Sequence, residues 1–184
     1  MSALGWVVLG SIVIVCLALA IAWWQSVETE AAGTERVSRP EALRDAELVY
    51  MEKLFRTAKP VGVAAKLDRA YRTPSGLLVL VELKTRWINQ PYISDVIQLS
   101  AQKVAVMGQT GQAVAPYAYV MVKAPTRRAL PIAYRVQLMT DEQVVALVTR
   151  RQDILAGRIL PRWPLSQKTC LSCAFRSQCN RSAP

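Results

Sequence analysis

The feature that most restricts how this chain can fold is an uncharged stretch near its N-terminus, from Leu4 to Trp24. A helix of about twenty residues is long enough to cross a hydrocarbon core of roughly 30 Å. Tryptophans stand near both ends of the stretch, as they do at membrane interfaces (Trp6, Trp23 and Trp24). We therefore expect residues 4–24 to form one transmembrane helix. A cleaved signal peptide is the alternative, but the stretch has no basic residue before it and bulky residues where cleavage would fall.

The net charge of +10 belongs entirely to the chain that follows this stretch. Arginines and lysines come after the stretch and none comes before it, so the positive-inside rule places the following domain in the cytoplasm. A strongly basic surface attracts polyanions, either nucleic acid or anionic lipid headgroups. The charge thus favours a nucleic-acid or membrane-surface partner, with a generally basic solvated surface as the alternative.

The chain has no histidine and four cysteines. Without histidine, Ser-His-Asp catalysis, Cys-His catalysis and histidine-ligated zinc are excluded. Cys16 lies in the apolar stretch, whereas Cys170, Cys173 and Cys179 are close together near the C-terminus. An odd, closely spaced set in a cytoplasmic domain favours metal binding over disulfide bonds.

The middle of the chain predicts an α/β domain at residues 41–160, preceded by a linker at 25–40 and followed by a cysteine-containing tail at 161–184. The prediction rests on helical and strand periodicity and on turn sequences such as RTPSG. The expected elements are a helix at 41–57, strands at 61–71 and 77–85, a helix at 93–107, strands at 117–122 and 133–139, and a helix at 141–156.

The strand at 77–85 (LLVLVELKT) is apolar enough to be a central strand buried on both faces, yet it carries Glu82 and Lys84. Because these residues are two positions apart, both side chains project from one face. Asp68, near the end of the preceding strand, can lie beside them. Two carboxylates suit Mg²⁺ or Mn²⁺, and a lysine beside them can orient a water and stabilise phosphate charge. A buried structural ion pair is the alternative.

The segment that contains Asp68 and ELK (82–84) resembles motifs II and III of the PD-(D/E)XK nuclease superfamily. Gln98 in DVIQLSAQ resembles the first residue of the QxxxY motif of the RecB-like branch, although Gln102 stands at the tyrosine position. The tail TCLSCAFRSQC is similar to the C-x2-C-x5-C cluster that closes RecB-like and CRISPR-associated single-strand exonucleases. Together these motifs extend over nearly all of residues 41–179.

The resemblance implies a restriction-endonuclease-like core that hydrolyses phosphodiester bonds in DNA, at ends or in single strands. It implies that Asp68 and Glu82 bind the divalent metal and that Lys84 positions the attacking water. Gln98 would orient the substrate or the metal ligands. The residues leave two points open: whether the substrate is DNA or RNA, and whether the enzyme is an exonuclease or an endonuclease.

The resemblance also implies two further metal features. The superfamily often uses an earlier acid, for which Glu52 or Glu47 on the expected first helix is the candidate; a solvated helix carboxylate is the alternative. The tail cysteines resemble the family's iron–sulfur site, which takes a fourth cysteine upstream of the core, where this chain has none. A [4Fe–4S] cluster on three thiolates, zinc with an outside ligand, and a tail without metal all stay open.

Basic residues near the expected site fit a track for phosphates, and Tyr71 and Trp87 could stack on unpaired bases. The basic residues are Lys66, Arg69, Arg72, Lys84, Arg86 and Lys103. Two rival functions stay open. One is an inactive membrane-anchored nucleic-acid-binding or scaffold protein that keeps a nuclease-like fold, and the other is a structural protein that binds lipid headgroups.

Overall fold

The computed structural model describes residues 15–20, 23, 33, 35–36, 39–126, 129–162, 164, 167–171 and 173–178. The chain divides into two compact units, Met1–Val144 and Val145–Pro184. The division falls within helix α3 (Asp141–Leu155). The second unit also contains the short helix α4 (Gln167–Leu171) and the 3-10 helix η2 (Arg176–Gln178).

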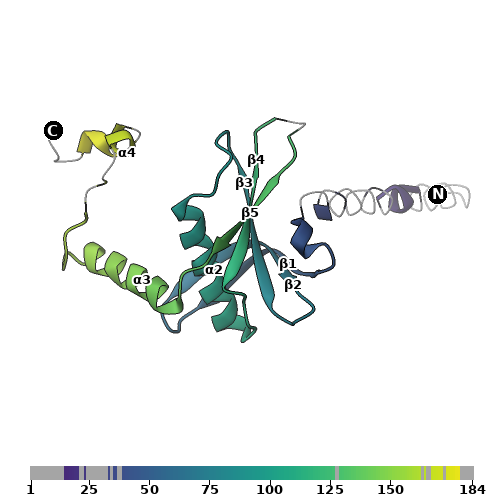
Figure 1. Ribbon diagram of the computed structural model, residues 1–184, viewed down its shortest axis with the longest axis horizontal. Helices are drawn as coiled ribbons and strands as arrows, with labels where there is room; N and C mark the ends of the chain where they lie inside the picture. Colours follow the sequence, from purple (N-terminus) through teal and green to yellow (C-terminus); the bar gives the residue numbers. More distant parts are fainter. Residues whose placement is uncertain are drawn as a thin grey trace, which may run out of the picture. The chain divides into compact units, whose positions relative to one another are not determined.

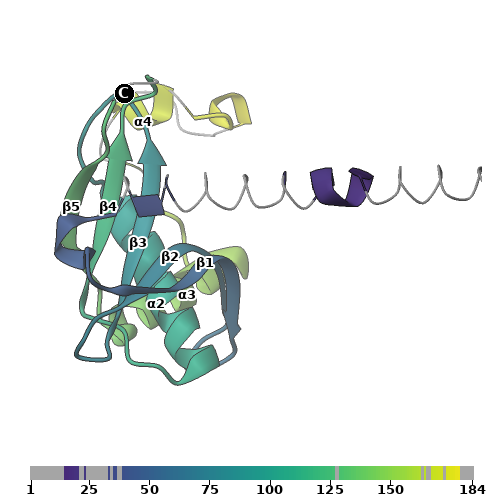
Figure 2. The same cartoon turned by 90° about the vertical axis from the view of Figure 1, so that its right-hand side faces the viewer.

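The first unit is built on a five-stranded sheet with the strand order β1-β2-β3-β4-β5. The strands are β1 (Glu47–Thr57), β2 (Val63–Arg72), β3 (Leu78–Thr85), β4 (Tyr117–Lys123) and β5 (Ile132–Gln137). β3 and β4 are parallel, whereas the other neighbours are antiparallel. Helix α2 (Ile93–Thr110) connects the parallel pair and packs against β1, β2 and β3, as Figure 1 and Figure 2 show from two sides.

The central position predicted for the strand at 77–85 is confirmed. β3 is the middle strand, and its first five residues, Leu78 to Glu82, are all buried. Leu78 and Leu80 pack in the core under α2, while Val79 and Val81 pack in a second core on the opposite face. Because both faces of Leu78–Val81 are covered, this part of the strand has no solvent side, which explains its continuous apolar sequence.

The prediction of a helix at 41–57 is wrong. Only Glu41–Leu43 is helical, as the 3-10 helix η1, and Glu47–Thr57 forms the edge strand β1. β1 has a register shift between Leu48 and Tyr50, and Glu52 has a positive φ of 49°. These irregularities interrupt the two-residue alternation expected of a strand, so the apolar residues fall at helix-like intervals.

The remaining predicted elements are observed with small shifts at their ends. The RTPSG turn closes as expected: Thr73 N donates to Leu77 O at 2.9 Å and Gly76 N donates to Thr73 O at 2.9 Å. Gly76 has a φ of 84°, a conformation that glycine adopts without the strain of a side chain. β4 and β5, the two strands predicted at 117–122 and 133–139, form an antiparallel pair from Tyr117↔Gln137 to Val122↔Ile132.

The N-terminal predictions concern residues that the structure describes only in part. Residues 15–20 are helical, and the rest of the expected transmembrane stretch, residue 23 apart, lies outside the described residues. No helix within the described ranges has both the length and the apolarity to cross a bilayer. Within the expected linker, Glu35 is 5% exposed and accepts hydrogen bonds from Arg39 at 2.8 Å and from the Tyr71 hydroxyl at 2.5 Å.

Candidate active site

The two strands that carry the predicted acids separate at the position of those acids. The last paired residues of β2 and β3 are Arg69 and Val81. Asp68 and Glu82 lie immediately beyond that pair, and Asp68 Oδ2 accepts a hydrogen bond from the backbone N–H of Leu83 at 2.8 Å. The Asp68 carboxylate therefore lies against β3 between Glu82 and Lys84. The structure brings these three residues together as the sequence predicted.

Glu82, Lys84 and Gln98 form a closed network of contacts. Lys84 Nζ lies 2.7 Å from Glu82 Oε1 and donates to Gln98 Oε1 at 2.9 Å, while Gln98 Nε2 donates to Glu82 Oε1 at 2.7 Å. Glu82 is 2% exposed, whereas 26% of the Lys84 side chain reaches solvent. The network therefore holds a buried carboxylate and presents an ammonium group at the surface.

Gln102, which stands at the tyrosine position of the QxxxY motif, is a further residue of the site that was not predicted from the sequence. Its Nε2 donates to Glu82 Oε2 at 2.9 Å and to the Lys66 carbonyl oxygen at 2.9 Å, and the residue is 1% exposed. The four-residue spacing from Gln98 was the available signal, because residues four apart lie on the same face of a helix.

The two candidates for the earlier acid lie in different places. Glu52 stands on β1 between Met51 and Lys53, which pair with Arg69 and Leu67, so it lies beside the Asp68 segment of β2. It also forms an ion pair with Lys66. Glu47 lies at the start of β1 and contacts Arg72 at 3.2 Å. The structure thus places Glu52 at the candidate site and Glu47 away from it.

The electrostatics of this region favour an added cation. Burial raises the pKa of Asp68 above its ordinary value; the Leu83 N–H opposes this shift, and the negative charges of Glu82 and Glu52 raise the pKa further. A nearby cation would relieve this repulsion between carboxylates. Lys84 already acts in this sense, and a bound cation would further favour the ionised form of Asp68.

The donor atoms fit Mg²⁺ or Mn²⁺. Asp68 and Glu82 offer only oxygen, which hard divalent cations prefer, and Mg²⁺ commonly takes one or two carboxylates together with substrate phosphates. Among the described residues, no three histidine, cysteine or acidic side chains converge on one ion position. The candidate metal ligands that the fold brings together are thus the carboxylates of Asp68 and Glu82, and Glu52 lies nearby as a further negative charge.

The residues predicted to contact nucleic acid differ in their exposure to solvent. Tyr71 is fully buried, so the prediction that it stacks on bases is wrong. Trp87 is 74% exposed and remains accessible for stacking. Arg69 is 7% exposed and donates to the Glu35 carbonyl at 3.4 Å, and Arg86 is paired with Asp95 at 2.6 Å. These two arginines therefore serve contacts within the fold.

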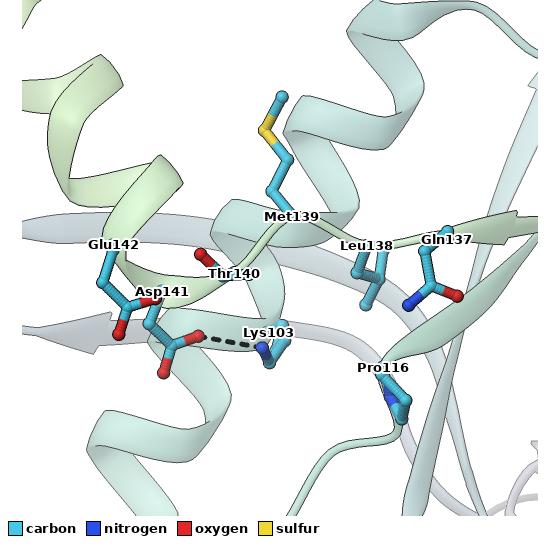
Figure 3. Close-up of a pocket in the computed structure, with 8 residues that line it drawn as sticks. All are labelled: Lys103, Pro116, Gln137, Leu138, Met139, Thr140, Asp141 and Glu142. Carbon is cyan, nitrogen blue, oxygen red and sulfur yellow. Dashed lines mark ion pairs between the residues drawn. The ribbon is translucent and has the colours of Figure 1, made fainter.

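A pocket of about 300 Å³ lies in another part of the first unit (Figure 3). Its lining residues are Lys103, Pro116, Gln137, Leu138, Met139, Thr140, Asp141 and Glu142. Lys103 pairs with Asp141 at 2.9 Å, which the dashed line in Figure 3 marks. Because this ion pair already uses the lysine, the pocket adds no uncompensated positive charge to the carboxylate site.

The predicted cysteine cluster is described in part. Cys170 lies on α4, and Cys173 N donates to the Cys170 carbonyl at 3.3 Å. Cys179 lies outside the described residues. The three-cysteine metal site therefore stays a prediction.

The fold and the site together define a class of protein. A mixed sheet carries an aspartate and an ExK triplet at the point where two central strands separate, with an amide-bearing helix against the glutamate. Residues 10–180 match the family model of the PD-(D/E)XK nuclease superfamily, and the chain belongs to this superfamily.

Two solved structures are similar to this chain. The chain is 17% identical to the protein SSO0001, over 89% of this chain and 75% of that one, with a TM-score of 0.45. It is 14% identical to a protein of Eubacterium rectale named "Putative exonuclease", over 82% of this chain and 59% of that one, with a TM-score of 0.50. At 14% identity, the similarity to the E. rectale protein concerns the fold alone. A sequence search of curated proteins found no match.

Proposed function

We propose that this protein is a metal-dependent nuclease that hydrolyses phosphodiester bonds in DNA, acting as an exonuclease. The observation that carries the proposal is the network of Glu82, Lys84 and Gln98 beside Asp68, in which a partly exposed lysine is held against a buried carboxylate. The name of the E. rectale protein supports an exonuclease. The basic charge of the chain supports a polyanionic substrate.

Asp68 and Glu82 would hold the divalent cation, which supplies positive charge against the scissile phosphate when it is bound. The Leu83 N–H fixes one oxygen of Asp68 at 2.8 Å. Lys84 Nζ lies at the solvent side of the network and would donate to the attacking water or to a phosphate oxygen. Gln98 contacts both Glu82 and Lys84, and would so hold these two side chains in place relative to each other.

Stability alone is a weak explanation for this network. Buried ion pairs contribute little in comparison with apolar residues of similar size, because desolvation of the charges offsets their attraction. Glu82 follows four buried apolar residues on the central strand of the sheet, where an apolar residue would fit the core. A charged residue at this position is better explained by chemistry than by packing.

Replacement of the two charged residues tests the proposal. Glu82→Ala should abolish Mg²⁺- or Mn²⁺-dependent cleavage of linear DNA. Lys84→Ala should slow it on the order of 10²–10³-fold, the typical effect of losing one positioned charge at the transition state. Lys123→Ala is the matched control, because Lys123 lies on the adjacent strand opposite Thr85. Salt-dependent DNA binding should persist in all three variants.

The same variants distinguish catalysis from structure. If Glu82 and Lys84 were only a structural ion pair, Lys84→Ala would leave the buried Glu82 carboxylate without its cation and lose several kcal/mol of stability, and Glu82→Ala would lose less because Lys84 reaches solvent. Wild-type protein that binds DNA and cleaves none, with variants that mainly melt earlier, would instead indicate an inactive nucleic-acid-binding protein with a nuclease-like fold.

We also propose that residues 4–24 tether this nuclease to a membrane with its domain in the cytoplasm, and that the tail cysteines hold an iron–sulfur cluster or zinc. The uncharged apolar sequence and the arginines and lysines that follow it support the tether. The spacing of Cys170, Cys173 and Cys179 supports the metal. Release of the protein from membranes by alkaline carbonate would contradict the tether.

A further inference from the structure

Gln102 lies fully buried at the point where β2 separates from β3. The ladder between these strands ends at Arg69↔Val81. Beyond that pair the Gln102 amide lies between the strands, because its Nε2 donates to Lys66 O on β2 and to Glu82 Oε2 on β3, both at 2.9 Å. The side-chain amide of Gln102 thus links the two acid-bearing strands by hydrogen bonds where their backbone hydrogen bonds have ended.

This double contact bears on the distance between the two carboxylates. Lys66 lies two residues from Asp68 on β2, so holding its carbonyl fixes the strand segment that carries Asp68. The same NH₂ group fixes Glu82 Oε2, while Gln98 and Lys84 contact only Oε1. Of these three residues, Gln102 alone contacts both Glu82 and the backbone of the Asp68 strand.

The hydrogen bonds of Gln102 are not those of an optimally satisfied core residue. Its Oε1 is buried and has no hydrogen-bond partner among the described residues. A buried acceptor without a partner destabilises a fold, and native proteins contain few of them. The position therefore keeps an amide at a cost in stability, which is consistent with a role for its two N–H donors.

We propose that Gln102 is a positioning residue that sets the gap between Asp68 and Glu82 and thereby tunes the affinity of this site for a divalent cation. The inference rests on the proposed function. A side-chain amide has two N–H donors and can serve both acceptors at once, whereas a tyrosine hydroxyl has a single O–H. The glutamine at the expected tyrosine position thus gives this chain a bridge between the strands that one phenol donor cannot supply.

The test compares two methionine substitutions on the same helix. Gln102→Met keeps a side chain of similar length but removes both donors. Gln109→Met is the matched control, because Gln109 also bonds to a strand backbone, accepting from Arg56 N at 2.6 Å, and lies away from the acids. Mn²⁺ binding to the full-length protein is measured from the electron paramagnetic resonance signal of free Mn²⁺. Gln102→Met should bind Mn²⁺ about 10–100-fold more weakly, as loss of an outer-shell contact typically causes, and Gln109→Met should bind it as wild type does.

Asp68→Asn separates failure of this inference from failure of the proposed function. If wild-type protein binds no Mn²⁺, or Asp68→Asn binds it equally well, the proposed metal site is wrong. If Asp68→Asn loses binding but Gln102→Met matches wild type, the metal site stands and the role of Gln102 is refuted. An equal loss in Gln102→Met and Gln109→Met would also refute it, because general loosening of the helix would then explain both.

A measurement on wild-type protein covers the case in which Gln102→Met does not fold. In a Mg²⁺ titration followed by NMR, the side-chain NH₂ signals of Gln102 should shift with the same midpoint as the backbone N–H of Leu83, which donates to Asp68. Gln102 signals that stay fixed while the Leu83 signal shifts would overturn the proposal.

Discussion

Tyr71→Phe tests whether the segment before the first strand is part of the folded domain. The Tyr71 hydroxyl donates to the buried Glu35 carboxylate at 2.5 Å, and the Arg39 guanidinium lies 5.0 Å from the Tyr71 ring centre. Burial and the neighbouring Glu35 raise the pKa of Tyr71 to about 12, so the phenol stays a donor at neutral pH. The substitution removes one hydrogen bond to a charged group and leaves no cavity, which costs about 1.5–3 kcal/mol.

Thermal unfolding measures this loss. For a chain of this size each kcal/mol shifts the Tm by roughly 2–4 °C, so Tyr71→Phe should melt roughly 3–12 °C below wild type. Tyr119→Phe is the control, because within the described residues the Tyr119 hydroxyl makes no hydrogen bond and its ring packs edge-on against Tyr117 at 6.1 Å. Equal melting of Tyr71→Phe and wild type would show that the Glu35 segment is not docked, and that the domain begins after it.

Three further outcomes follow from the structure. Burial acts to raise the pKa of Glu35, but hydrogen bonds from Arg39 and Tyr71 outweigh it and hold that pKa below its ordinary value. The stability that Glu35 contributes is therefore complete at neutral pH and is lost as the pH falls below 4.5 and through the lower folded-state pKa. The urea midpoints of wild type and Glu35→Gln should converge over that fall in pH, and a constant difference would contradict this linkage. Gly108→Ala should destabilise the protein by about 1–3 kcal/mol in urea titrations, because the new Cβ would clash with the side-chain oxygen of Thr57. Wild-type stability would refute that contact. Anaerobically purified wild-type protein should contain iron or zinc, and Cys173→Ser should lose it. Wild-type protein without either metal would contradict the proposed metal site of the tail cysteines.

The centre of the sheet could be predicted because its sequence signals are local. Leu77 to Val81 is continuously apolar, and only a strand covered on both faces explains such a run in a sheet protein. The two-residue spacing of Glu82 and Lys84 then fixes their common face, and the RTPSG turn brings Asp68 alongside. Each step depends on residues within one hairpin.

The edges of the domain depend on tertiary contacts and were not predictable in this way. The burial of β1 is irregular because it is an edge strand with a register shift and a positive φ at Glu52, so its periodicity resembled a helix. Glu35 lies in a polar stretch that resembles a linker, and its burial depends on partners that are distant in the sequence, Tyr71 and Arg69. The four-residue spacing places Gln102 on the same helix face as Gln98, but its two contacts depend on where β2 separates from β3, which is a tertiary feature.

Cleavage of an end-labelled DNA oligonucleotide with Mn²⁺ tests whether Asp68 and Glu82 form the metal site of a nuclease. Wild-type protein should shorten the oligonucleotide only when the metal is present. Asp68→Asn should lower the rate on the order of 100-fold or more, since even outer-shell residues around a metal contribute 10–100-fold. Equal cleavage by wild type and Asp68→Asn, or no cleavage by wild type of single- or double-stranded DNA, would show that Asp68 and Glu82 are not such a site.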